Sequence, residues 1–327
     1  MPPGLEPVQH VFRRVTVPAE LAGRRFDQVA AALLGEFSRS RLKQWIEGGE
    51  LTVAGRAAAP KARLKGGEEL VLDAALEAAV PVSPEPIALA VVHAEAAFFV
   101  VDKPAGLVVH PGAGNRSGTL QNALLNLDPA LAGVARAGLV HRLDKDTSGL
   151  LVVARTLSAQ QKLAAELERR LVRRVYRAIC QGVLTGGGTI DAPLGRHPRE
   201  RTKMAVRERG RPARTHYRVV ERFRAHTHLE VTLETGRTHQ IRVHMAHIRA
   251  PLVGDPAYGG RPKLPRAPTA ALRAVLQAFH RQALHAAGLS FAHPGTGAPL
   301  SFESALPPDM AALLEALRAD RDAEAPR

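Results

Sequence analysis

The sequence predicts an α+β fold in two parts, a small N-terminal domain and a larger domain with a mixed or antiparallel sheet. Three observations support this. The chain of 327 residues is long enough for two domains with sizeable cores. Residues 74–90 are rich in alanine, contain three prolines and show no amphipathic period, which is typical of a linker. The strand-like segments beyond it lack the regular strand–helix–strand rhythm of a parallel sheet.

The N-terminal part is expected to form two helices and short strands. Apolar residues at helical spacing run from Phe26 to Leu34. Ser38 is a plausible N-cap for a second helix. That helix would present three basic residues: Arg39, Arg41 and Lys43. Short strands are predicted at 51–53 and 69–72.

The larger part contains further predicted elements. Strands are expected at 98–102, 175–183 and 228–234, and the last of these alternates apolar and polar residues, as in a sheet with one solvated face. Helices are expected at 120–127 and from Ser158 to Leu171. The polar tail is expected to fray. The predicted N-terminal domain covers residues 1–80, with a core at about 24–73. A linker follows at 81–90. The predicted C-terminal domain covers residues 91–318, and the tail covers 319–327.

The composition favours a polyanionic partner. The formal net charge is +14 and the isoelectric point is about 10.8. These values favour a nucleic acid over a membrane surface as the binding partner. No apolar run approaches the roughly 20 residues of a membrane span, and no secretory signal is visible. The single cysteine, Cys180, excludes an internal disulfide and is interpreted as a small buried residue in a strand. We therefore expect a cytoplasmic protein.

The positive charge is concentrated in the larger part. Residues 196–224 contain ten arginines and one lysine against three glutamates. A charge run is usually a solvated face, but cations of one sign repel each other unless a polyanion neutralises them. We expect this patch to bind RNA through residues that include Arg199, Arg201 and Lys203.

The most informative segment is His141–Leu151. It places the carboxylate of Asp144 between Arg142 and Lys145, ahead of a Thr-Ser-Gly turn and an apolar run. Neighbouring cations keep a carboxylate ionised and attract anionic substrates. The segment resembles the active-site motif of the RluA-type pseudouridine synthases, and this resemblance assigns to Asp144 the role of catalytic nucleophile.

A second segment, residues 235–244, resembles another motif of the same family. There, the arginine after the aliphatic residue pairs with the catalytic aspartate, which implies that Arg242 pairs with Asp144. Arginine suits this role because its guanidinium is always charged and grips a carboxylate with two donors. In the same segment, Arg237 and His239 are expected to contact RNA.

A third match is the run Arg173–Ala178. From the residues alone, Tyr176 would be interpreted as a core tyrosine at the start of a strand. The resemblance instead implies that Tyr176 stacks on the target base. It also implies that Arg142 enters the space that the base vacates and that His141 lines the same wall.

Neither a metal nor a cofactor is expected. His239, His244 and His247 lie close in sequence, but no further ligand sits at a familiar metal-binding spacing. Converting uridine to pseudouridine breaks one bond to the sugar and makes another without net redox change, so no cofactor is required.

The N-terminal part resembles the S4 RNA-binding domain. The matching segments are Arg25–Asp27, Ser38–Arg41 and Ile46–Gly49, and a small helical cap with scattered arginines is the alternative interpretation. The resemblance implies that the basic residues of the second helix bind RNA.

The family likeness covers nearly the whole chain, including residues 251–262 and 281–286. It extends furthest to members that modify the large ribosomal subunit, which implies 23S rRNA as the partner, either free or within an assembling subunit. A monomer is expected, without contact to membranes.

Two other functions stay open on the residues. One is a non-catalytic RNA-binding protein of ribosome assembly. The other is a nucleoside or glycoside hydrolase, which usually needs a second working carboxylate. It also stays open whether Asp144 attacks C6 of the base or C1′ of the ribose.

Overall fold

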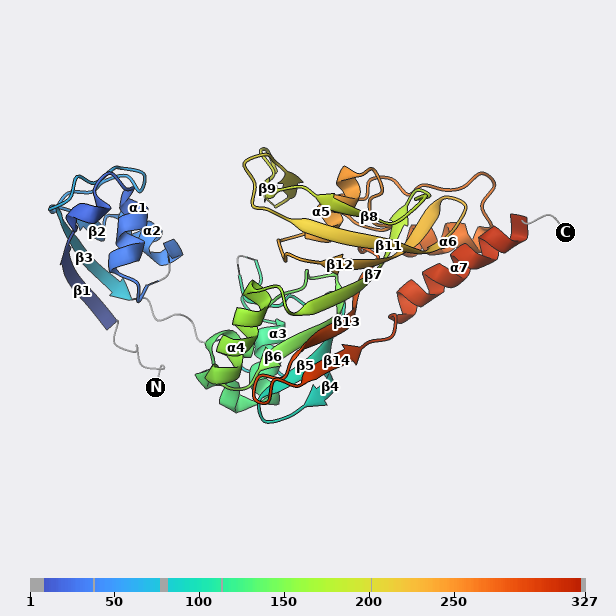
Figure 1. The fold of residues 1–327 in the computed structure, drawn as a ribbon, viewed down its shortest axis with the longest axis horizontal. Helices are drawn as coiled ribbons and strands as arrows, with labels where there is room; N and C mark the ends of the chain where they lie inside the picture. The colour runs from blue at the N-terminus through green and yellow to red at the C-terminus, as the bar shows by residue number, and fades with distance from the viewer. Residues whose placement is uncertain (1–8, 38, 77–81, 113, 201, 325–327) are drawn as a thin grey trace, which may run out of the picture. The chain divides into compact units, whose positions relative to one another are not determined.

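The computed structural model describes residues 9–37, 39–76, 82–112, 114–200 and 202–324 (Figure 1). The chain divides into two compact units, residues 1–81 and 82–327. Each unit has its own apolar core. The predicted N-cap Ser38 lies outside the described residues.

The first unit packs two helices on a three-stranded antiparallel sheet in the order β1-β3-β2. Its strands and helices are β1 (Gln9–Thr16), β2 (Leu51–Val53), β3 (Glu69–Leu76), α1 (Phe26–Leu33) and α2 (Arg39–Gly48), with a short 3-10 helix at Ala19–Leu21. Phe26, Leu42 and Trp45 bury the helical faces against the sheet. Both predicted helices are therefore present, and their basic residues lie away from the core.

Strand β1 was missing from the prediction. Four of its eight residues are Gln9, His10, Arg13 and Arg14, so it shows little apolar alternation. It is held by pairing along the whole length of β3, from Gln9 opposite Leu76 to Thr16 opposite Glu69. Such a long-range partner is not visible in the local pattern.

The second unit is built on a nine-stranded sheet in the order β4-β5-β6-β13-β7-β12-β11-β8, with β14 paired to β13. All neighbouring pairs are antiparallel except β6 with β13. The predicted α+β class with a mixed, mainly antiparallel sheet is confirmed. The strands are β4 (Ala90–Ala94), β5 (Phe98–Lys103), β6 (Ser148–Ala154), β7 (Arg173–Gln181), β8 (Gly188–Asp191), β11 (Arg214–Arg222), β12 (His226–Leu233), β13 (Leu284–Ala292) and β14 (Pro299–Glu303), beside a separate pair, β9 (Leu194–Arg196) and β10 (Met204–Val206).

Helices cover both faces of this sheet. They are α3 (Leu120–Leu127), α4 (Leu157–Glu168), α5 (Gln240–His247), α6 (Ala270–Ala278) and α7 (Pro308–Glu324), with short 3-10 helices at Pro129–Gly133 and Ala135–Gly138. On β5, Phe99 packs into the cluster that contains α3 and α5, whereas Phe98 packs into the cluster that contains α4. Helices α6 and α7 lie side by side and pack against Ile179 of β7 (Figure 1). Burial on both faces explains why β5 and β6 are continuous apolar runs.

Several predicted boundaries differ from the structure by a few residues: β3 extends to Leu76, β7 covers Arg173–Gln181 and not 175–183, and β12 covers His226–Leu233 and not 228–234. Helix α4 begins at Leu157, one residue before the predicted cap, because Thr156 Oγ1 accepts the Ala159 N–H at 3.1 Å. It ends at Glu168, so Leu171 lies beyond it and is exposed. Residues 319–324 were expected to fray, but they belong to α7.

Asp320 accounts for the order of the α7 end. This residue is buried and accepts hydrogen bonds from Arg224 at 3.1 Å and from the Thr269 N–H at 2.6 Å. The tail composition is polar, as the prediction noted, but one polar side chain turns inward and is fully bonded.

The predicted linker, residues 74–90, overlaps two strands, because β3 continues to Leu76 and β4 begins at Ala90. Residues 82–89 contain no helix or strand and belong to the second unit, where they are bonded to its other segments. Asn122 Nδ2 donates to the Ser83 carbonyl at 2.8 Å, and Glu85 accepts the Gly118 N–H at 3.0 Å. Ile87 and Leu89 pack on the main core.

Candidate active site

Asp144 lies in a turn that leads into β6. The Thr147 N–H closes the turn by donating to the Asp144 carbonyl at 3.1 Å. Lys103, at the end of β5, is fully buried and donates from Nζ to the Lys145 carbonyl at 2.9 Å. Burial lowers the pKa of Lys103 to about 8, although the charges of Asp146 and Asp144 oppose this shift. The backbone that follows Asp144 is therefore held from a neighbouring strand.

A close approach between β6 and β13 also fixes this turn. Gly149 has φ +114°, and a Cβ at this position would lie 2.3 Å from the Ala286 carbonyl oxygen. Only glycine fits, because both the backbone conformation and the contact exclude a side chain. Beside it, Ser148 Oγ and His285 Nδ1 are 2.9 Å apart.

The predicted pairing of Asp144 with Arg242 is present. Arg242 Nη1 lies 3.1 Å from Asp144 Oδ2, although the two residues are 98 positions apart in sequence. The remaining donors of Arg242 bind Asp255, with Nε 2.7 Å from Oδ2 and Nη2 2.9 Å from Oδ1. Burial works to lower the pKa of Arg242, but Asp255 and then Asp144 outweigh burial and raise it. The cation therefore remains charged beside Asp144.

Asp255 and Tyr258 were missed as site residues, although their segment was recognised as part of the family likeness. The Asp255 side chain is fully buried and accepts backbone N–H groups of Ala257 and Tyr258 at 2.9 and 3.1 Å. The Arg242 guanidinium lies over the Tyr258 ring, 5.1 Å from its centroid. A charged residue in a Gly-Asp-Pro turn just after the arginine motif was the available signal.

His239 was predicted to contact RNA, and in the structure it lies beside Asp144. Its Nε2 is 4.0 Å from Asp144 Oδ1, and its Nδ1 is 2.8 Å from the Tyr258 hydroxyl. Burial lowers the pKa of His239, with Asp144 opposing the shift. Its backbone has φ +54° and forms the N-cap of α5. It therefore joins Tyr258 in one wall of the site.

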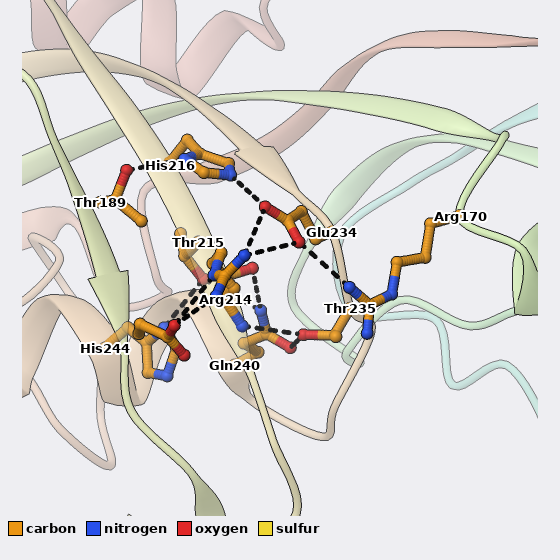
Figure 2. A network of polar contacts seen from close by, with 10 residues as sticks. Arg170, Thr189, Arg214, Thr215, His216, Glu234, Thr235, Gln240 and His244 are labelled. Carbon is orange, nitrogen blue, oxygen red and sulfur yellow. Dashed lines mark hydrogen bonds and ion pairs between the residues drawn. The ribbon is translucent and has the colours of Figure 1, made fainter.

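A hydrogen-bond chain anchors the start of α5 to β11 (Figure 2). Thr235 Oγ1 donates to Gln240 Oε1 at 2.8 Å, and Gln240 Nε2 donates to Thr215 Oγ1 at 3.0 Å. The Thr215 hydroxyl then donates to His244 Nδ1 at 2.8 Å, and His244 Nε2 donates to the Ala192 carbonyl at 2.9 Å. Because burial lowers the pKa of His244, the neutral ring can accept at Nδ1 and donate at Nε2. Both nitrogens are thus used within the protein.

Glu234 gathers two arginines and a histidine next to this chain (Figure 2). Its oxygens lie 3.1 Å from Arg170, 3.4 Å from Arg214 and 2.8 Å from His216. Its hydrogen bond from His216 and the neighbouring charge of Arg214 lower the pKa of Glu234. This carboxylate is therefore already neutralised by the protein.

These side chains surround a cavity of about 600 Å³ in the second unit. This volume is within the range of small-ligand sites and suits a nucleotide. The predicted site residues that line it are Asp144, Arg242, Tyr176, Arg142, His141, Arg237 and His239. One cavity thus contains residues from all three sequence motifs.

Tyr176 and Arg142 line the cavity in different ways. Tyr176 is 5% exposed and belongs to the main apolar core, so the core interpretation also describes it. Burial raises the pKa of its hydroxyl, and no hydrogen bond to that hydroxyl is formed among the described residues. Arg142 is exposed. The tyrosine is positioned as a wall and the arginine as a cation at the surface.

The other predicted RNA-binding residues lie elsewhere. Arg39 and Lys43 are exposed on α2 in the first unit, Arg41 lies over the Trp45 ring, and Lys43 pairs with Glu47 at 3.3 Å. Around β9 and β10, Arg199 is exposed, and Lys203 forms an ion pair with Glu200 at 2.7 Å. Arg201 lies outside the described residues.

No group of three or more His, Cys, Asp or Glu side chains in the described part of the chain is placed to hold a metal ion. His244 uses both nitrogens internally, and His247 is exposed. Cys180 is buried in β7, where burial raises its pKa to about 12. None of the helices described is long and apolar enough to cross a membrane.

Comparison with known proteins agrees with this geometry. The family model described as RNA pseudouridylate synthase matches residues 97–247, and the S4 domain model matches residues 24–70. The protein named Ribosomal large subunit pseudouridine synthase D of Xanthomonas campestris is 56% identical over 96% of this chain and 95% of its own length. This chain belongs to the RNA pseudouridylate synthase family.

Other family members show the same likeness. Proteins of the same name are 56% identical in Pseudomonas aeruginosa, over 96% of this chain and 98% of theirs, and 49% identical in Escherichia coli, over 95% and 96%. Two human structures match the pseudouridine synthase fold. RNA Pseudouridylate Synthase Domain Containing 4 has a TM-score of 0.54 at 26% identity, covering 70% of this chain and 93% of its own. Domain Containing 1 has a TM-score of 0.52 at 25% identity, covering 72% and 98%.

Proposed function

We propose that this pseudouridine synthase isomerises uridine to pseudouridine in 23S rRNA of the large ribosomal subunit. The observation that supports this most directly is the Asp144–Arg242 ion pair in the wall of a nucleotide-sized cavity. The S4 domain and the excess of cations support an RNA substrate. The names of the full-length relatives support ribosomal RNA of the large subunit.

The reaction balances without a co-reactant. The bond from N1 of uracil to C1′ of ribose breaks, the base turns, and C5 joins C1′. The proton leaves C5, and N1 gains one. Asp144 would bond transiently to C6 or to C1′ and leave unchanged, which divides one difficult step into easier ones.

The remaining residues support this step. Arg242 binds the Asp144 carboxylate and holds it at the cavity. The Tyr176 ring would lie against the extruded base, since a π face accepts any base. Extrusion of a base costs a few kcal/mol, and Arg142, exposed at the cavity, would fill the gap left in the RNA.

A chemical label specific for pseudouridine tests this proposal. Its sites are mapped across rRNA from a strain that lacks this gene and from the same strain with the gene restored. We expect one or more 23S sites to disappear on deletion and to return with the wild-type gene. Identical maps would contradict the proposal and leave the non-catalytic assembly protein as the function. Release of free uracil from purified RNA would instead indicate a hydrolase.

We also infer a monomer that acts in the cytoplasm. The choice between free rRNA and an assembling particle stays open. Activity of the purified protein on protein-free 23S rRNA, compared with activity on isolated precursor particles, separates the two substrates.

A further inference from the structure

Arg174 is a buried cation without a counter-ion in the cavity wall. It lies on β7 two residues before Tyr176, and the two side chains share one face of the strand. Its side chain is only 9% exposed and lines the cavity. Among the described residues, no hydrogen bond or ion pair involves its guanidinium, and its Nε is fully buried. Arg242, buried to a similar degree in the same cavity, contacts two carboxylates.

An unpaired buried guanidinium is unfavourable. Burial of an isolated charge costs several kcal/mol, and arginine cannot escape the cost by losing its proton. Of the acidic residues that line the cavity, Glu234 is already engaged with Arg170, Arg214 and His216, and Asp144 is paired with Arg242. Glu168 is exposed and forms no ion pair with Arg174 among the described residues. The protein therefore leaves the buried charge of Arg174 for a ligand to neutralise.

His141 supplies a second donor without an acceptor. Burial, followed by the charge of Arg174, lowers the pKa of His141 to about 3, so its ring is neutral. Its Nε2 accepts the Val152 N–H at 3.2 Å. The ring proton must therefore be on Nδ1, which is buried and has no partner among the described residues. His141 lines the same cavity as Arg174.

We propose that Arg174, assisted by the Nδ1–H of His141, binds a phosphate that flanks the target uridine. The inference rests on the proposed function and adds a phosphate subsite to it. A phosphate supplies the missing negative charge, which a neutral uracil carbonyl does not. Residues two apart on a strand are separated by about 6.6 Å. A base against Tyr176 would thus leave its neighbouring phosphate within reach of the long Arg174 side chain.

Neutral phosphate substitution tests this subsite. The RNA is the shortest 23S rRNA fragment that the wild-type protein binds with full affinity, with single phosphates replaced by methylphosphonate. At one phosphate next to the modified uridine, we expect the wild type to lose between about 10-fold and 100-fold in affinity. Arg174→Met should lose a similar factor on unmodified RNA. On the substituted RNA, the affinity of Arg174→Met should be less than about 3-fold below that of the wild type, because the charged phosphate that Arg174 would bind is already absent.

Arg173→Met is the matched control. Arg173 is adjacent and exposed, and it lies on the opposite face of β7. The factor by which Arg173→Met lowers RNA affinity should be the same on unmodified RNA and on RNA with methylphosphonate at that position, because the two changes act independently. The inference is overturned if Arg174→Met lowers RNA affinity by the same factor on unmodified RNA and on every methylphosphonate-substituted RNA.

Gly236→Ala keeps the test valid if Arg174→Met does not fold. A Cβ on Gly236 would lie 2.7 Å from Arg174 Nη1, so this substitution displaces the guanidinium and keeps its charge. We expect Gly236→Ala to be at least about 3-fold less sensitive than the wild type to the critical methylphosphonate. Equal sensitivity would contradict the subsite. Binding is measured independently of turnover, so the two proposals can fail separately. If the variant and the phosphate substitution affect binding in a non-independent way but no pseudouridine forms, the proposed function alone is refuted. If pseudouridine forms but the two effects are independent, the subsite alone is refuted.

Discussion

Asp255 holds Arg242 by two hydrogen bonds, at 2.7 and 2.9 Å, and leaves Nη1 of that guanidinium for Asp144. Asp255 is itself held by backbone N–H groups of the turn that follows it. The orientation of Asp144 therefore depends, through Arg242, on a loop with which Asp144 forms no hydrogen bond or ion pair among the described residues. A buried acid–base pair of this kind adds less to stability than to geometry, because desolvation offsets the attraction.

Asp255→Asn tests this positioning role. The amide would set an NH₂ group against the guanidinium and release Arg242 from its orientation. We expect kcat to fall by at least about 10-fold while RNA affinity changes by less than about 3-fold. The free energy of unfolding should fall by about 3 kcal/mol. Asp322→Asn makes the same change at an exposed ion pair and should alter neither quantity. A fall in affinity with kcat unchanged would show that Asp255 does not act through Arg242.

Tyr176 is predicted to act on the base through its ring. Tyr176→Phe preserves the ring and removes a hydroxyl that has no hydrogen-bond partner among the described residues. RNA affinity of this variant should stay within about 3-fold of the wild type. Tyr176→Ala should lose between about 5-fold and 150-fold in affinity, since stacking contributes about 1–3 kcal/mol per base. Fluorescence titration with the 23S fragment measures both, and equal affinity of the Phe and Ala variants would argue against stacking.

The sequence predicted the reacting pair but not its support. Asp144 and Arg242 were found through motif resemblance, because each lies in a contiguous run of characteristic residues. Asp255 acts through a contact between a loop and α5, and only its place in a Gly-Asp-Pro turn soon after the arginine motif marked it in the sequence. Its type alone does not distinguish a partner of arginine from an ordinary turn residue.

Arg174 belongs to the matched run Arg173–Ala178, in which only Tyr176 was singled out. The alternation of β7 distinguishes the two neighbouring arginines, because Arg174 is buried on the face that carries Tyr176 and Ala178, while Arg173 is exposed. Period-two burial was the available signal. Strand β1 was missed for the opposite reason, since its polar residues give no period and its place is set by pairing with β3.

The arginine patch around β9 and β10 should contribute to the salt dependence of RNA binding. Arg199, Arg207 and Arg209 are all exposed there. Their replacement by glutamine should reduce the slope of log affinity against log salt by about 2, at about 0.7 per phosphate contact with single-stranded RNA. An equal triple at Arg261, Arg266 and Arg273, also exposed, is the control. Identical slopes for the two triples would mean that the patch does not contact RNA.

Two buried histidines on β12 should make folding sensitive to acid. Burial lowers the pKa of His226 and of His228 from 6.5 to about 4. The unfolded chain therefore binds these protons at higher pH than the folded chain does. The free energy of unfolding should be fully retained above about pH 6.5 and should fall as the pH is lowered towards 4.

Denaturant unfolding at several pH values between 7.5 and 4 measures this dependence. The double variant His226→Gln, His228→Gln should show a flatter decline than the wild type over this interval. His247→Gln, at an exposed position of α5, should leave the decline unchanged. A double variant with the wild-type decline would locate the acid sensitivity elsewhere.

The most direct measurement of the central claim is the rate of pseudouridine formation by purified Asp144→Asn on 23S rRNA, read with the pseudouridine-specific label. Asparagine keeps the shape of the side chain and removes the charged nucleophile beside Arg242. We predict no detectable product, with RNA affinity within a few-fold of the wild type. Formation of pseudouridine at the wild-type rate would show that Asp144 is not the nucleophile and would contradict the account.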